Sequence, residues 1–219
     1  MCLYPKLIKN PKYLPNKSNN YNPPKCEDER TMYVPIGCGN CIECKRKTAN
    51  QWKVRLNEEL KITEGKFVTL TFSEDKLKEL CEKIKIEKGF NARNIDIDSN
   101  VVAARGVKDF LNRWRKTEKK SPRHWLITEL GHNNTERIHI HGIIFTDKNN
   151  EFIQKKWLEG NAFIGNECDA KTINYIIKYI TKTDDKHKGF KGLVMCSPGI
   201  GKNYIGVIVT GKQIGRAHV

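Results

Sequence analysis

The chain has 219 residues, of which 38% are hydrophobic and 30% are charged, which is typical of a folded domain with one sizeable core. No apolar run approaches the ~20 residues of a membrane-spanning helix, and the N-terminus lacks the pattern of a signal peptide, so we expect a cytoplasmic protein with no membrane partner. The 40 Lys and Arg against 25 Asp and Glu give a net charge of +15, which favours a nucleic-acid partner over a merely solvated basic surface.

Residues 1–37 are rich in Pro, Asn, Lys and Tyr and lack periodicity, which predicts an irregular arm. Three cysteines follow at spacings of three, Cys38, Cys41 and Cys44. In a cytoplasmic chain, thiols at this density favour a metal over disulfides, and structural zinc takes four ligands. We therefore expect a zinc site whose fourth ligand is Cys2 or Cys26. The alternative is a reduced turn that simply packs.

The next segments alternate between helical and strand patterns. Hydrophobic periodicity predicts helices over residues 45–63, from Ser73 onward and over 105–119, and strands over 66–72 and 124–131, with a polar loop at 88–100. In the first helix we expect the apolar positions to be Ala49, Trp52, Val54, Leu56, Leu60 and Ile62.

Two histidines flank one isoleucine in the run from 137 to 145, whose many β-branched residues predict a buried strand. His139 and His141 then point to one face, about 6.6 Å apart. The short loop before this strand predicts a hairpin, which places Glu129 of the preceding strand beside both histidines. Together these side chains predict a site for one divalent cation. The alternatives are two polar positions on a solvent face and an exposed carboxylate at a strand end.

Asp169 can cap a helix over residues 171–182, in which the unit Tyr-x-x-Lys occurs twice. Tyr175 and Tyr179 lie one helical turn apart, about 6 Å, on one face. Lys178 and Lys182 repeat that spacing on the adjacent stripe. By itself this pattern favours an ordinary amphipathic helix.

Combined with the cation site, the tyrosines and lysines indicate a site that cleaves phosphodiesters. A metal polarises a phosphate oxygen, and a tyrosine that receives local help with deprotonation attacks the phosphorus. The products are a 5′-phosphotyrosine and a free 3′-hydroxyl, so the strand can be rejoined. A second tyrosine allows a second transfer while the first link is intact.

These motifs carry a resemblance to a known family. His139-Ile140-His141 matches the His-hydrophobic-His motif of the HUH endonucleases, and the two tyrosines match the motif of their rolling-circle initiator branch. Residues 67–72 match the first strand motif of that branch. More closely, the chain resembles the replication initiators of gokushovirus-type microviruses, which are small single-stranded DNA phages. This closer resemblance rests on residues 1–5, 37–45, 129–131 and 197–202.

The resemblance implies an α+β fold with a central antiparallel sheet and flanking helices, the His-x-His strand in its middle and the tyrosine helix against the metal site. It implies Mg²⁺ or Mn²⁺ as the catalytic ion, and a rolling-circle initiator that nicks origin DNA, single-stranded or in the replicative form. Host helicase and polymerase would then extend the 3′ end in the bacterial cytoplasm. The expected site residues are Glu129, His139 and His141 for the metal, and Tyr175, Tyr179, Lys178 and Lys182 for catalysis.

Three segments are expected: an irregular arm with the cysteine cluster over 1–44, an endonuclease domain over 45–212, and a foreign tail over 213–219. The tail reads Ile-Gly-Arg-Ala-His-Val from residue 214, the translation of a widely used sequencing adapter, so we expect a C-terminally truncated domain. Two other functions fit the residues. One is a plasmid initiator or transposase of the HUH class, and the other is a non-catalytic, zinc-containing nucleic-acid-binding protein.

Overall fold

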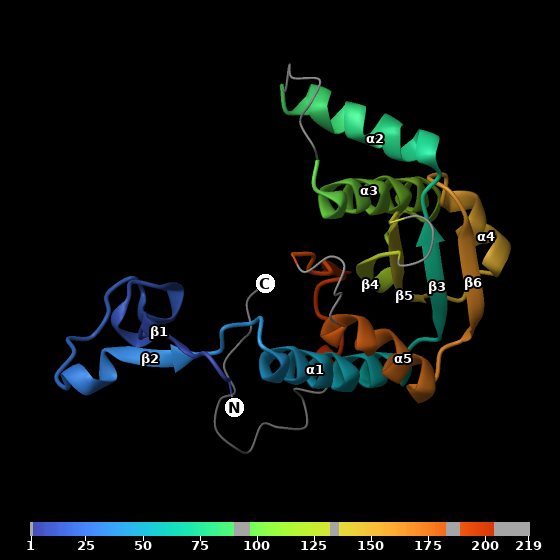
Figure 1. The fold of residues 1–219 in the computed structure, drawn as a ribbon. Coiled ribbons are helices and arrows are strands. Elements are labelled where there is room, and N and C mark those ends of the chain that lie inside the picture. Colours follow the sequence, from blue (N-terminus) through green and yellow to red (C-terminus); the bar gives the residue numbers. More distant parts are fainter. Residues whose placement is uncertain (1, 90–96, 132–135, 183–188, 204–219) are drawn as a thin grey trace. The chain divides into compact units, whose positions relative to one another are not determined.

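The computed structural model describes residues 2–89, 97–131, 136–182 and 189–203 (Figure 1). They form two compact units, Met1–Asn50 and Gln51–Val219, each described by itself below. The expected foreign tail at 213–219 lies outside the described residues. Within the described ranges, no helix combines the length and the apolar character that a bilayer crossing requires.

The first unit contains a small two-stranded ribbon. Strand β1 (Lys6–Lys9) pairs antiparallel with β2 (Tyr33–Ile36), and three short 3-10 helices lie between them: η1 (Pro11–Tyr13), η2 (Lys17–Asn19) and η3 (Glu29–Thr31). The sequence predicted irregular structure here, because strands of four residues carry too little alternation to be recognised. No residue from 2 to 40 is fully buried, so this arm has no apolar core of its own.

The second unit is built on a five-stranded antiparallel sheet with the order β6-β3-β5-β4-β7. Its strands are β3 (Gly65–Thr71), β4 (Arg123–Leu130), β5 (Ile138–Phe145), β6 (Ala162–Glu167) and β7 (Val194–Cys196). Strand β5, which carries the His-x-His motif, is the middle strand. The predicted central antiparallel sheet, with this strand in its middle, is therefore confirmed.

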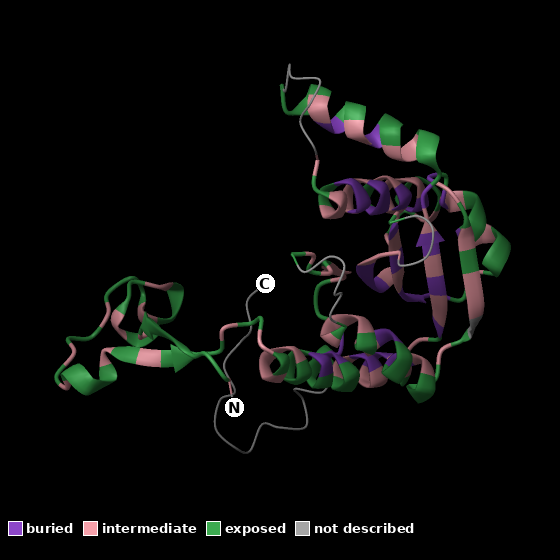
Figure 2. Cartoon of the chain, viewed as in Figure 1, coloured by how far each residue is buried: buried purple, intermediate pink, exposed green. Residues whose placement is uncertain are grey.

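Helices cover both faces of the sheet (Figure 1). They are α1 (Ile42–Leu60), α2 (Glu74–Glu87), α3 (Ser99–Glu118), α4 (Asn150–Lys156) and α5 (Ala170–Thr181). One core joins Ile140 of β5 to Phe110 and Trp114 of α3, and the other joins Ile143 to residues of α1 and α5. Buried residues accordingly lie along the strands and along α1 and α3 (Figure 2).

Most predicted elements match the observed ones within three residues, and the exceptions have local causes. Helix α3 begins at Ser99 instead of 105, because Asp98 caps it by accepting a hydrogen bond from the Asn100 N–H. The short elements α4 and β7 were not predicted. Val54 and Ile62 are exposed, because the buried side of α1 follows Trp52 and its neighbour one turn on, Leu56.

A buried ion pair ties α1 to β4 and to the segment after β7. Glu59 is only 3% exposed and accepts hydrogen bonds from the Arg123 guanidinium, whose Nη2 lies 2.8 Å away, and from the Gly201 N–H at 2.9 Å. Gly201 has φ +65°, and a Cβ there would lie 2.5 Å from Arg55 Cα, so only glycine fits. Burial alone would raise the pKa of Glu59, but the two donors outweigh it and hold that pKa below its usual value.

We expect Arg123→Met to lower the free energy of unfolding by about 3 kcal/mol at pH 7, because it leaves the Glu59 carboxylate buried without a cation. The pair stabilises the wild type fully above the ordinary carboxyl pKa, and that contribution is lost as pH falls through the lowered pKa of folded Glu59. The deficit of the variant should therefore shrink in acid. Urea denaturation at pH 7 and near pH 4 measures both effects.

The matched control is Lys61→Met, which removes an exposed partner of Glu58 on the same helix. It should change the stability by less than about 1 kcal/mol at either pH. Equal stability of Arg123→Met and Lys61→Met at pH 7 would contradict the assignment.

Candidate active site

The register of the central strands brings the predicted cation ligands together. Glu129 of β4 lies directly opposite His139 of β5, and Thr69 of β3 lies directly opposite His141. Directly paired residues in an antiparallel sheet point to the same face, so these four side chains share one surface. The isoleucines at 138, 140 and 144 point to the other face, into the core beneath α3.

His141 and Glu129 are in direct contact. The Nε2 of His141 lies 3.0 Å from Oε2 of Glu129, and its Nδ1 lies 3.1 Å from Oγ1 of Thr69, so both ring nitrogens have partners. Burial favours the neutral carboxyl of Glu129, but His141 and Lys182 outweigh burial and hold its pKa below the usual value. Burial, together with the neighbouring His141, lowers the pKa of His139. At neutral pH the site therefore offers a carboxylate and a neutral His139 imidazole, the form that binds metals.

These side chains fit a divalent cation in donor type and partly in distance. A cavity of about 30 Å³ adjoins Glu129, Tyr179 and Lys182, which is room for a water-sized occupant. The two imidazole rings are 6.5 Å apart between centroids, so His139 reaches an ion held by Glu129 and His141 only by turning its ring. Among the described residues, only a group of cysteines has three or more metal-ligating atoms within 4.8 Å of one another.

The tyrosine helix, α5, lies against this site. Asp169 and Thr172 form a reciprocal capping box at its start, as the Asp169 prediction requires, and Ile173 and Ile176 bury one side. The ring of Tyr179 stacks on His141 with centroids 4.4 Å apart, and its hydroxyl donates to that of Tyr175 at 3.0 Å.

The two tyrosines differ in environment. Tyr175 is 50% exposed, whereas Tyr179 is half-buried. Burial, and then the hydrogen bond to Tyr175, raise the pKa of Tyr179. Tyr179 is therefore neutral at physiological pH, and attack by its hydroxyl requires help with deprotonation.

Each lysine of the repeat lies over its own tyrosine. Lys178 Nζ is 5.8 Å from the centroid of the Tyr175 ring, and Lys182 Nζ is 5.8 Å from that of Tyr179. Lys182 also donates to Oε1 of Glu129. The structure thus brings all seven predicted site residues to one region of the sheet surface.

Two residues near the site were not singled out from the sequence. Thr69 positions the His141 ring, and Phe67 meets the Tyr175 ring edge-on at 6.1 Å. Their alternation along β3 puts them on one face, but only the pairing with β5 shows that it is the histidine face.

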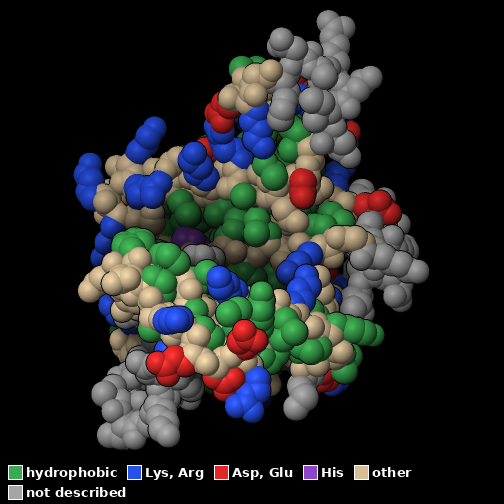
Figure 3. Space-filling view, turned by 90° about the vertical axis from the view of Figure 1, so that its left-hand side faces the viewer, with side chains coloured by type: hydrophobic (Ala, Val, Ile, Leu, Met, Phe, Trp, Pro, Cys, Tyr) green, Lys and Arg blue, Asp and Glu red, His purple; other side chains and the backbone are tan. Residues whose placement is uncertain are grey.

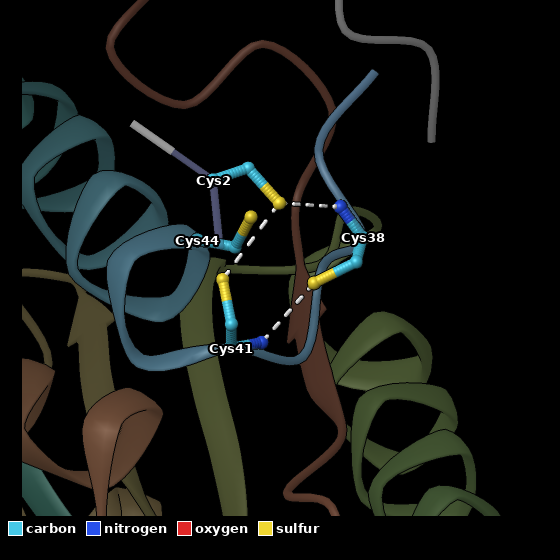
Figure 4. Close-up of side chains that lie close together, drawn as sticks. All are labelled: Cys2, Cys38, Cys41 and Cys44. Atoms are coloured by element: carbon cyan, nitrogen blue, oxygen red, sulfur yellow. Dashed lines mark hydrogen bonds between the residues drawn. The ribbon is translucent and has the colours of Figure 1, made fainter. Parts of the chain in front are cut away.

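The cysteine cluster lies entirely in the first unit. The Sγ atoms of Cys2, Cys38, Cys41 and Cys44 all lie within 4.8 Å of one another, and those of Cys2 and Cys41 are 3.8 Å apart (Figure 4). Backbone N–H groups donate to two of the sulfurs, Cys38 to Cys2 at 3.2 Å and Cys41 to Cys38 at 3.3 Å. This group of four thiols can hold a metal ion.

Of the two candidates for the fourth ligand, the structure places Cys2 in the cluster. The β1–β2 pairing sets Lys6 opposite Ile36, so the residues before β1 run back beside those that follow β2. Cys26 lies in the connection between the strands, where its thiol donates to the Asp28 carbonyl at 3.2 Å.

The sequence model of a family of replication-associated proteins, the ORF2 family, matches residues 65–184, which is more than half of the 219 residues. The match spans β3 to α5 and so contains the glutamate, both histidines, both tyrosines and both lysines of the site. No curated protein and no solved structure is significantly similar to the chain.

Proposed function

Because the chain belongs to the ORF2 family of replication-associated proteins, we propose that it is a rolling-circle replication initiator that nicks and rejoins one strand of origin DNA. The observation that carries the proposal is the pair of tyrosine hydroxyls, 3.0 Å apart and stacked through Tyr179 on the His141–Glu129 pair. Membership of a replication-associated family and a net charge of +15 both imply a DNA partner. Lys and Arg side chains are spread over the face drawn in Figure 3.

In the proposed reaction, Glu129, His141 and a turned His139 hold Mg²⁺ or Mn²⁺, which polarises a phosphate oxygen when bound. His141 binds through Nε2, and its Nδ1–H then donates to Thr69, which keeps the ring in place. A tyrosine oxygen forms a bond to the phosphorus as the bond from phosphorus to O3′ breaks. The phenolic proton leaves to solvent and O3′ takes up a proton, while Lys178 and Lys182 steady the phosphate charge.

The phosphotyrosine bond conserves the energy of the phosphodiester, so a 3′-hydroxyl can attack it and restore the strand. With two tyrosines, the second hydroxyl cuts after one round of synthesis while the first still holds the 5′ end. We propose a single-stranded DNA phage of the gokushovirus type as the source, with host helicase and polymerase as partners in the bacterial cytoplasm. A plasmid initiator or transposase would use the same chemistry.

The test is formation of a covalent adduct. Fluorescent single-stranded oligonucleotides that tile the replicon encoding this chain are incubated with the protein and Mn²⁺ or Mg²⁺, then separated in denaturing gels. We expect one or few oligonucleotides to give a protease-sensitive, slow-migrating band that EDTA abolishes. If no oligonucleotide gives an adduct with either ion, the chain is a non-catalytic DNA-binding protein and the proposal fails.

We also propose that the four-cysteine cluster is a structural zinc site. Four thiolates bound to zinc at about 2.3 Å in a tetrahedron lie ~3.8 Å from one another, and the sulfurs of Cys2 and Cys41 are 3.8 Å apart. The arm lacks a buried core, and a unit of about 40 residues usually needs a metal or disulfide to fold. The N–H groups aimed at the sulfurs of Cys2 and Cys38 offset the negative charge of the thiolates.

Cys2→Ser should therefore lose zinc, whereas Cys26→Ser, the matched control in the same arm, should retain one ion per chain. Elemental analysis of protein purified under reducing, chelator-free conditions measures the content. Removing zinc should also make the first 50 residues sensitive to protease, because metal binding supplies folding free energy. Equal zinc in the two variants, or none in the wild type, would overturn the assignment.

A further inference from the structure

An aromatic side chain projects from the edge of the sheet beside the candidate active site. Strand β6 is an edge strand, and its Phe163 is 63% exposed. Phe163 pairs directly with Thr69, which in turn pairs with His141, so the three residues form one rung across β6, β3 and β5. Since paired residues share a face and strands lie about 4.8 Å apart, Phe163 stands on the histidine face about 10 Å from His141.

A second ring lies between Phe163 and the tyrosines. Phe67 is two residues from Thr69 on the same strand, and its ring is 6.1 Å from that of Tyr175 and 6.5 Å from that of His141, measured between centroids. A Cβ at Gly165 would lie 3.2 Å from the Phe67 ring and 3.7 Å from the Phe163 ring, so the glycine leaves the space between the two rings open.

This space continues into a groove of about 340 Å³. Its lining combines the rings of Phe67 and Tyr175 with Lys171 and Thr172 at the start of α5, and with one acidic side chain, Glu167. Exposed aromatic faces interleaved with cationic groups are what proteins use to bind single-stranded nucleic acid, because every base offers a π face and every linkage a negative charge. A protein partner would need a far larger surface than this groove offers.

We propose that Phe163, with Phe67 beside it, is a stacking platform for an unpaired base close to the phosphate that the tyrosines attack. The inference rests on the proposed nicking function, since the active site supplies the strand. The platform holds the DNA beside the tyrosines by stacking, without reading the sequence through hydrogen bonds. A duplex cannot use it, because its bases are stacked on one another.

The first test is the affinity for a nicked-site oligonucleotide in EDTA, where no cleavage competes, measured by fluorescence anisotropy. We expect Phe163→Ala to weaken single-strand binding about 5- to 150-fold, the usual effect of losing one stacked base. Phe163→Trp should restore binding, whereas duplex affinity should change less than twofold. The control, Ile86→Ala, removes an exposed apolar side chain of α2 and should bind like the wild type.

The second test locates the base. Oligonucleotides with one abasic position each are scanned on both sides of the nick. An abasic position close to the nick should weaken binding by the wild type and have no further effect on Phe163→Ala, because the two changes remove the same contact. If Phe163→Ala binds like Ile86→Ala, or if the two losses add at every position, the platform is wrong.

Failure of the platform and failure of the nicking proposal give different results. A wild type that forms the covalent adduct, together with an unaltered Phe163→Ala, overturns the platform alone. A wild type that forms no adduct, together with a weakened Phe163→Ala, overturns the nicking proposal and supports the platform as a single-strand binding site.

Discussion

Replacing Tyr175 and Tyr179 together with Phe should lower covalent adduct formation by about 10⁴-fold or more, since removing the nucleophile of a covalent mechanism costs up to about 10⁶-fold. Each single Phe variant should still form adduct, because the two hydroxyls are 3.0 Å apart and either can approach the same phosphate after a small shift. Phe keeps both the ring stacked on His141 and the edge contact with Phe67, so lost packing does not confuse the result.

The readout is the fraction of a labelled origin oligonucleotide that becomes protein-bound in a denaturing gel. Tyr21→Phe, at an exposed tyrosine of the arm, is the control and should behave as the wild type. One outcome contradicts a two-nucleophile mechanism: a single variant that forms no adduct while the other cleaves and rejoins normally. The inactive variant would then mark the one nucleophile, and the other tyrosine would be a packing aromatic.

Replacing His139 and His141 with Ala should abolish nicking, by at least about 10³-fold, while single-strand affinity changes only a few-fold. The loss follows from removing both imidazole ligands, which leaves Glu129 alone to hold the divalent ion; loss of a metal's support is among the largest effects in such sites. The DNA-binding charge and the exposed rings of Phe163 and Tyr175 are untouched by the change.

Three measurements on the same preparations separate the effects: Mn²⁺ binding by calorimetry, adduct formation, and anisotropy with oligonucleotide in EDTA. His139→Ala is the more informative single variant, because His141 also contacts Thr69, Glu129 and Tyr179 and its loss disturbs their positions. Metal-dependent cleavage that persists unchanged in the double variant would sink the ligand assignment.

Local sequence patterns determined the elements and the faces of this protein. Alternation places the two histidines on one side of β5 and the isoleucines on the other, and the hairpin places Glu129 opposite His139. The Asp169 cap and the four-residue spacing of the tyrosines fix the helix that carries them. These features follow from periods of 2.0 and 3.6 residues and from capping, which depend on near neighbours in the chain.

Only the tertiary structure decided which distant groups meet. The pairing of β1 with β2 places Cys2 in the cluster and leaves Cys26 in the connecting segment. The register of β6 on β3 puts Phe163 in one rung with His141, and the packing of α5 brings Lys182 to Glu129. The three residues of β7 form a strand through their pairing with β4. A one-residue change of register would move each such side chain to the opposite face, and no local pattern specifies that register.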